Sequence, residues 1–130
     1  MRIHDYFAAV ERGLCENVPA GRIEDAVTSL ASDDHNGLLR CRLVFWDGSY
    51  LDIYEVVSTE LGYPVRVHYA YTYIRNERRV FRYDNAPHHP EILTHPHHKH
   101  IGPADRLAPA DQPGLGQIIQ EIANWLGQSA

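Results

Sequence analysis

Two runs of alternating polar and apolar residues, 40–45 and 49–53, flank the dipeptide Asp47-Gly48 and constrain the fold more than any other feature of the chain. Alternation with a period of two is typical of half-buried β-strands, and an Asp-Gly dipeptide between such strands indicates a hairpin. A three-residue loop would pair Leu43 with Leu51 and would gather the apolar side chains on one face of the hairpin. That face would hold Cys41, Leu43, Phe45, Leu51 and Ile53.

A second hairpin is predicted further along the chain. Residues 65–74 are rich in β-branched and aromatic side chains, and residues 80–83 return after a turn centred on Asn76-Glu77. Two residues at the centre of the turn would give the cross-strand pairs Tyr71–Arg82 and Thr72–Phe81. The Thr, Ser and Val content of residues 23–32 also favours a strand there.

Apolar stripes at helical spacing predict a helix near each end of the chain. The first covers residues 3–14, and the second begins near Pro113 and ends at Gly127. Residues 84–113 are rich in proline and show no apolar period, so we expect a long ordered loop or a pair of short turns there. The chain, residues 1–130, is therefore expected to be a single α+β domain. Its core would be one twisted antiparallel β-meander of about four to five strands, covered by an N-terminal and a C-terminal helix.

Six of the nine histidines lie between residues 88 and 100. Histidine exchanges a proton near neutral pH and is also the commonest transition-metal ligand. Pro87, Pro90 and Pro96 stiffen the same stretch, since each proline fixes φ and restricts the residue before it. We therefore predict that residues 82–100 form the active or binding site and that the remainder is scaffold.

The formal net charge of −5 argues against a general nucleic-acid coat. The positive charge is nevertheless concentrated beside the histidines, because residues 66–106 hold seven Lys or Arg against four Asp or Glu. This distribution favours a site that handles phosphate. No apolar stretch of a signal peptide and no run approaching ~18 apolar residues is visible. We therefore expect a soluble cytoplasmic protein without a membrane partner.

These residue types suit acid–base cleavage of a phosphodiester in RNA. A base would deprotonate the ribose 2′-hydroxyl, an acid would protonate the leaving 5′-oxygen, and cations would stabilise the phosphoryl oxygens. Asp84 could orient one histidine through its second ring nitrogen. The candidate catalytic residues are His88, His89, His97, His98, Lys99, His100 and Asp84. The candidate substrate-binding residues are Arg82, Arg79, Tyr83, Asn85, Tyr71 and His68.

Two alternatives from other functional classes stay open. Such a ribonuclease would need no cofactor, whereas a histidine-rich metal-binding or metal-dependent module would hold a divalent ion such as zinc on His95, His97 and His100. His95 and His97 would lie on the same side of an extended chain, although their spacing matches no diagnostic metal motif. The remaining alternative is an interaction protein whose histidine loop docks a partner.

The histidine segment resembles the signature of a known family. Residues 81–91 (FRYDNAPHHPE) and residues 95–100 (HPHHKH) are similar to the TumE family of prokaryotic toxin–antitoxin toxins. An N-terminal amphipathic helix, the hairpin at Asp47-Gly48-Ser49 and a following aromatic strand match the same layout. The resemblance covers most of the chain, but only residues 81–100 are specific, and residues 102–113 are particular to this sequence.

The resemblance implies a type II toxin that acts as an endoribonuclease and is held inactive by a helix-turn-helix antitoxin encoded beside it. It does not indicate which histidine is the acid and which is the base. The residues that match the family pattern are Asp84, Asn85, His88, His89, His97, His98, Lys99 and His100.

Overall fold

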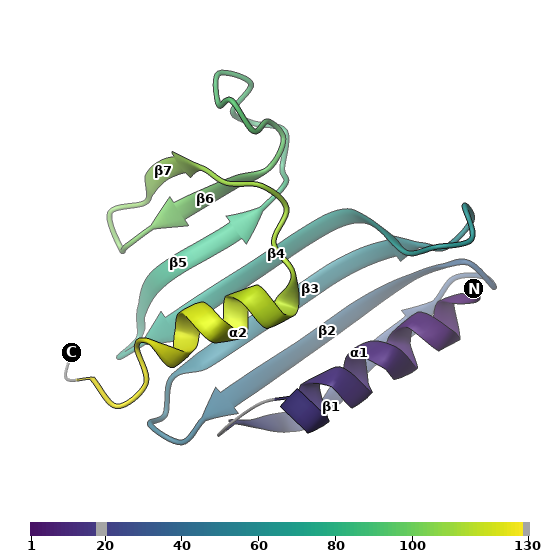
Figure 1. Ribbon diagram of the computed structural model, residues 1–130, viewed down its shortest axis with the longest axis horizontal. Coiled ribbons are helices and arrows are strands. Elements are labelled where there is room, and N and C mark those ends of the chain that lie inside the picture. Colours follow the sequence, from purple (N-terminus) through teal and green to yellow (C-terminus); the bar gives the residue numbers. More distant parts are fainter. Residues whose placement is uncertain (18–20, 129–130) are drawn as a thin grey trace.

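The computed structural model describes residues 1–17 and 21–128, which form two helices and one sheet of seven strands. In chain order the elements are α1 (Ile3–Asn17), β1 (Gly21–Ala31), β2 (Asn36–Phe45), β3 (Tyr50–Ser58), β4 (Val65–Arg75), β5 (Arg78–Asp84), β6 (His98–Ile101), β7 (Arg106–Pro109) and α2 (Leu115–Ala123). Figure 1 shows the strands following one another across the sheet.

The sheet is an antiparallel meander, because its strands lie in chain order and each is antiparallel to the next. This confirms the predicted architecture, but the predicted count of strands is too low, since the sheet has seven. The two missed strands, β6 and β7, lie within residues 84–113, where a loop or turns were expected. Each has only four residues, which is too short for a period of two to stand out in the sequence.

The first hairpin has the predicted register. Leu43 pairs with Leu51, and Cys41 pairs with Ile53. Gly48 has a φ of 86°, the left-handed conformation that a three-residue loop requires at its end. As expected, one face of the hairpin is apolar and buried, with Cys41, Leu43, Phe45, Leu51 and Ile53.

The second hairpin differs from its predicted register by one residue. Asn76 and Glu77 form the turn, both with positive φ, but a bulge then leaves Val80 as an extra residue in β5. Phe81 consequently pairs with Tyr73 on the apolar face instead of lying opposite Thr72. The observed pairs Tyr71–Tyr83 and Thr72–Arg82 replace the predicted Tyr71–Arg82 and Thr72–Phe81.

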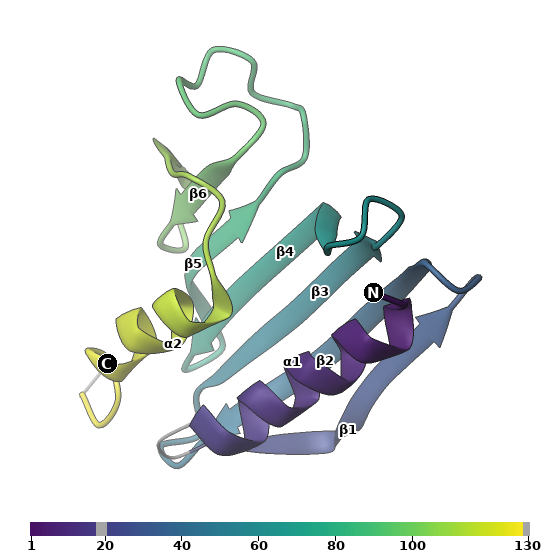
Figure 2. The same ribbon diagram turned by 45° about the vertical axis from the view of Figure 1, so that its right-hand side comes forward.

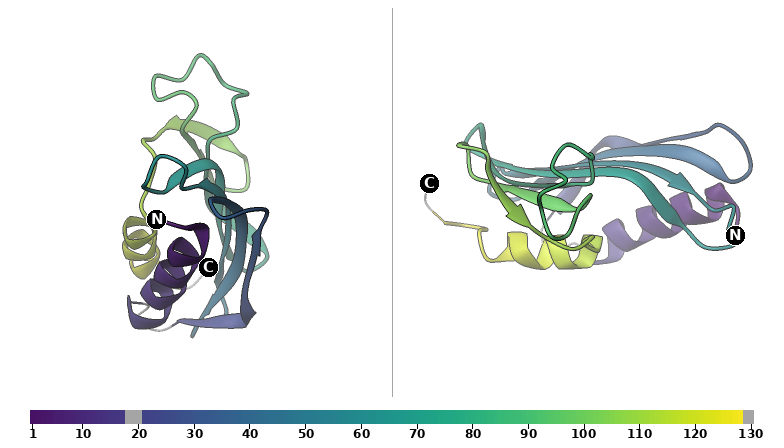
Figure 3. Two further views of the ribbon diagram at one scale, coloured as in Figure 1. Left: turned by 90° about the vertical axis from the view of Figure 1, so that its right-hand side faces the viewer. Right: turned by 90° about the horizontal axis from the view of Figure 1, so that it is seen from above.

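Both helices pack on the same face of the sheet (Figure 3). Figure 2 shows α1 lying along β1 and β2, with α2 beyond it towards β5. The predicted helical cover is confirmed, although α2 ends at Ala123 and Leu126 packs against the core from the following turn. No helix in residues 1–17 and 21–128 covers the opposite face, which we call the open face; the covered one is the helix face.

Candidate active site

Alternation along β5 and β6 divides the predicted site residues between the two faces of the sheet. Two cross-strand pairs lie on the open face, Asp84–His98 and Arg82–His100. The pair between them, Tyr83 and Lys99, lies on the helix face. Neighbours in the sequence therefore belong to two separate chemical environments.

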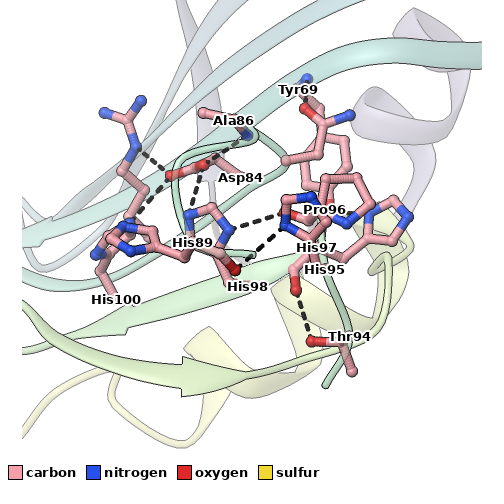
Figure 4. A network of polar contacts seen from close by, with 12 residues as sticks. Tyr69, Asp84, Ala86, His89, Thr94, His95, Pro96, His97, His98 and His100 are labelled. Atoms are coloured by element: carbon pink, nitrogen blue, oxygen red, sulfur yellow. Dashed lines mark hydrogen bonds and ion pairs between the residues drawn. The ribbon is translucent and has the colours of Figure 1, made fainter. Parts of the chain in front are cut away.

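Asp84, at the end of β5, is the centre of the open-face cluster (Figure 4). Its Oδ1 accepts a hydrogen bond of 3.0 Å from the backbone N–H of Ala86 and lies 2.8 Å from Nε2 of His98. Its Oδ2 accepts from Nε of Arg82 at 3.1 Å and lies 3.4 Å from Nε2 of His100. These four partners compensate for the burial of a carboxylate that is almost inaccessible to solvent.

His98 is the buried imidazole of the cluster, with only 2% of the residue exposed. Its Nδ1 lies 2.9 Å from the carbonyl oxygen of Pro96, and its Nε2 lies 2.8 Å from Oδ1 of Asp84. Both partners only accept hydrogen bonds, so the ring satisfies both when each nitrogen carries a proton. His98 thereby fixes Asp84 and the entry to β6 in place.

His100 lies on the other side of Asp84 and also contacts the β6–β7 turn. Its Nδ1 is 2.7 Å from Oδ1 of Asp105, but the contact lacks hydrogen-bond geometry and leaves this buried nitrogen without a hydrogen-bond partner. Asp105 is also ion-paired with Arg79. Burial lowers the pKa of His100, although the charges of Asp105 and Asp84 oppose the shift. The neutral form of His100 is therefore favoured at neutral pH.

His89, from the segment between β5 and β6, completes the cluster. Its ring centroid lies 5.2 Å from that of His98 and 5.9 Å from that of His100, and its Nδ1 is 3.4 Å from a carboxylate oxygen of Glu91. One ligand atom from each of the three histidines lies within 4.8 Å of the other two, a set that could hold a metal ion.

The zinc ligands expected from the sequence are not brought together as one set in the described part of the chain, since only His100 belongs to this cluster. His95 directs Nδ1 at the carbonyl oxygen of His89, 3.2 Å away. His97 directs Nδ1 at the hydroxyl of Tyr69, 2.8 Å away, and its ring stacks on the tyrosine with centroids 5.8 Å apart (Figure 4). Burial is the main cause that lowers the pKa of His97.

Lys99 lies on the helix face. Its ammonium forms an ion pair with Glu121 of α2 and lies 4.8 Å from the ring centroid of Tyr83. The hydroxyl of Tyr83 donates a hydrogen bond of 2.7 Å to the same carboxylate. Burial alone would lower the pKa of Lys99, but these contacts outweigh it, so the pKa is raised and the ammonium stays charged. The trio attaches α2 to the sheet on the side opposite Asp84.

Two further predicted substrate contacts lie inside the protein. Tyr71 is fully buried, donates to Glu55 and accepts a hydrogen bond of 2.8 Å from Arg66. The side-chain amide of Asn85 accepts from the N–H of Tyr69 and donates to a carbonyl oxygen of β4, each at 3.0 Å. Asn85 thus extends the β4–β5 ladder by one step and holds the chain immediately after Asp84.

The remaining predicted residues, His68 and His88, are exposed. His68 lies on β4, paired with Val56, and His88 follows Pro87 in the segment after β5. Within residues 1–17 and 21–128, no hydrogen bond, ion pair or ring contact joins either side chain to the cluster around Asp84.

Sequence reasoning missed Asp105, which contacts the cluster, and two residues further along the open face, Arg40 and Tyr54. Asp105 lies in the turn of an unpredicted hairpin, so no pattern indicated that it would reach His100. Arg40 and Tyr54 pair across β2 and β3 on the open face. The predicted register of the first hairpin placed Arg40 opposite its apolar face, and continuing the second strand by one residue beyond the predicted 49–53 would have placed Tyr54 there too.

Comparison with known families relates the chain to one of them. The model of the family described as Toxin TumE matches residues 16–128, a range that includes the whole sheet and α2. No match was found among curated proteins or among solved structures. None of the helices in the described residues is both long and apolar enough to cross a membrane.

Proposed function

This chain belongs to the TumE toxin family, and on that basis we propose that it is the toxin of a type II toxin–antitoxin pair and acts as an endoribonuclease. The observation that carries the proposal is the open-face cluster. His98 and His100 contact one buried carboxylate, and His89 lies beside both rings. Arg82 is paired with the same carboxylate, and Arg79 with Asp105 next to His100. We further propose that its partner is a helix-turn-helix antitoxin and that the toxin acts in the cytoplasm.

In the proposed reaction, Asp84 accepts the Nε2–H of neutral His100, and Nδ1 accepts the proton of the ribose 2′-hydroxyl once substrate displaces the exposed side chain of Asp105 from it. The 2′-oxygen then attacks phosphorus. The bond from phosphorus to the 5′-oxygen breaks, and His89 donates a proton to that leaving oxygen. The products are a 2′,3′-cyclic phosphate and a 5′-hydroxyl. The lowered pKa of His100 supports its role as base, because the base must be unprotonated at the start.

The other members of the cluster act through these two histidines or on the phosphate. Arg82 and Arg79 supply positive charge for the phosphoryl oxygens. Asp84 is a positioning residue that holds His100, and buried His98 fixes Asp84 in turn. Lys99 is assigned to the attachment of α2, because its charge is paired with Glu121 on the helix face.

A second candidate is a metal site on His89, His98 and His100, favoured by the proximity of their ligand atoms. Each nitrogen of His98 already faces an oxygen that accepts hydrogen bonds. A metal ion would therefore have to displace His98 from Asp84 or from Pro96 before it could bind that ring. This cost favours acid–base catalysis over metal binding as the function of the cluster.

The test is RNA cleavage by the purified chain in excess EDTA, with analysis of the product ends. His89→Ala and His100→Ala should each lower the rate by about 10²–10⁴-fold, whereas His4→Ala, at an exposed histidine on α1, should not. Cleavage that survives both substitutions, or that requires an added divalent metal, contradicts the proposal. Growth arrest on expression, relieved by the neighbouring gene, tests the toxin assignment itself.

A further inference from the structure

A shallow groove of about 640 Å³ crosses the open face beside the cluster. Its lining includes Arg40 of β2, Tyr54 of β3, Ala70 and Thr72 of β4, and Arg82 of β5. The small side chains Ala70 and Thr72 of β4 lie between larger ones of β3 and β5. The groove is therefore a consequence of the side-chain sizes along one face of the sheet.

The strand register makes this groove continuous with the candidate active site. Arg40 pairs with Tyr54, Tyr54 with Ala70, and Ala70 with Asp84, so these residues form one row across four strands. At about 4.8 Å between neighbouring strands, the row is about 14 Å long. Arg82 both lines the groove and donates to Asp84, which joins the two regions through a single guanidinium.

The groove combines a cation with an aromatic face. The guanidinium carbon of Arg40 lies 5.0 Å from the ring centroid of Tyr54. In the described residues Arg40 has no ion pair with a carboxylate, whereas the neighbouring Arg42 is bound to Asp52 by two hydrogen bonds of 2.7 and 3.0 Å. Arg40 is therefore the groove residue whose positive charge is available to an anionic ligand.

We propose that this groove binds single-stranded RNA, with a base stacked on Tyr54 and a phosphate on Arg40. A tyrosine face beside an arginine without a carboxylate partner, along a shallow groove, is the combination that binds unpaired strands, whose bases are free to stack on a side chain. The RNA then follows the row towards Asp84 and reaches Arg82 beside it, where the next phosphate meets His89 and His100. This inference rests on the proposed ribonuclease function for the identity of its ligand.

The experiment measures binding separately from cleavage. Affinity for a fluorescent oligouridine of about ten nucleotides, a length within the range such sites span, is measured with His100→Ala as the background. Tyr54→Leu in this background should weaken binding by about 5- to 100-fold, since it removes one stacking platform. Arg40→Gln should weaken binding and reduce the slope of log affinity against log salt by about 0.7, the value for one phosphate contact on a single strand.

Matched controls remove the same groups elsewhere on the surface. Arg12→Gln changes an exposed arginine on α1, and Tyr63→Leu changes an exposed tyrosine between β3 and β4. Both controls should retain full affinity, and the melting temperatures of all variants should agree. Loss of affinity confined to the groove variants supports the inference.

Two results would overturn it. If the Arg40 and Tyr54 variants bind RNA as tightly as the His100→Ala background does, RNA binds elsewhere. This holds even if the unsubstituted chain cleaves RNA as proposed. Equal losses in the Arg12 and Tyr63 controls show that RNA binding is not confined to the groove. If instead the groove variants lose affinity while the unsubstituted chain cleaves nothing, the groove assignment stands and the proposed catalytic function fails.

Discussion

The two faces of β6 both carry basic side chains, but these side chains differ in whether their polar atoms have partners. On the helix face, Lys99 is paired with Glu121 and lies beneath α2. On the open face, His100 retains a buried nitrogen without a hydrogen-bond partner in the described structure, as does Arg79 of the neighbouring strand β5. Unsatisfied buried polar atoms are rare in folded proteins and call for an explanation such as catalysis. The comparison supports the proposal that the helix face stabilises the fold and that the open face carries the catalytic groups.

The largest effect is expected from Asp84→Asn. An amide of the same shape presents a donor where His98 or His100 now faces a carboxylate oxygen, so it disturbs the orientation of the rings. Cleavage should fall by up to about 10⁴-fold, as when the orienting acid of a catalytic triad is replaced. Single-turnover kinetics measure the loss. A fully active Asp84→Asn variant would show that the open-face cluster is not the catalytic site.

Lys99→Met should have the opposite pattern, with a loss of stability and little loss of activity. Methionine retains packing on Phe81 and Tyr83 but leaves the partly exposed Glu121 without its cation. We expect a decrease of about 1–2 kcal/mol in the free energy of unfolding, measured by urea denaturation. A collapse of kcat at unchanged stability would instead place Lys99 in the reaction.

The pH dependence of cleavage should report His100. Because burial holds its pKa below 6.5, kcat/KM should be maintained as the pH falls to 6.5 and should decline only below that value, where the base becomes protonated. Asp105→Asn removes a charge that raises this pKa, so the decline should move to still lower pH. A shift to higher pH in that variant, measured from pH–rate profiles, would contradict the assignment of His100 as base.

The smallest effect is expected from His88→Ala. The side chain is exposed, and in residues 1–17 and 21–128 nothing links it to the cluster around Asp84. Cleavage and stability should both change by less than about 0.5 kcal/mol. A loss comparable to that of His89→Ala would show that the segment after β5 moves when substrate binds, which would enlarge the site.

Much of the fold could be predicted because its long elements obey simple periods. The strand pair around Asp47-Gly48 has the predicted register since alternation and turn length agree there. The strand pair around Asn76-Glu77 differs from its predicted register because a bulge leaves Val80 as an extra residue. This bulge lets Phe81 face the core, and nothing in the local sequence indicates it. The short strands β6 and β7 carry too few residues to show a period at all.

The candidate site could be located but not resolved into its parts from the sequence. The histidine-rich composition pointed to the segment that supplies His89, His98 and His100 to the cluster around Asp84. Which histidines converge depends on the faces assigned by β6, a strand that was not predicted. His97 and His98 are adjacent in the chain, yet one contacts Tyr69 and the other contacts Asp84. The composition of a segment shows which chemical groups it contains, whereas the strand register determines which of those groups come into contact.

The meander order has a consequence for control of the toxin. Each strand pairs only with its neighbours in the chain, so within the sheet the β6–β7 hairpin at the edge pairs with β5 alone, and the ion pair of Lys99 with Glu121 adds a contact to α2. Releasing that hairpin would carry His98 and His100 away from Asp84 without breaking any pairing among β1 to β5. Local opening of this kind requires less free energy than global unfolding. An antitoxin that bound this edge and trapped the opened state would inactivate the toxin reversibly, and faster hydrogen exchange at residues 98–109 would reveal the opening.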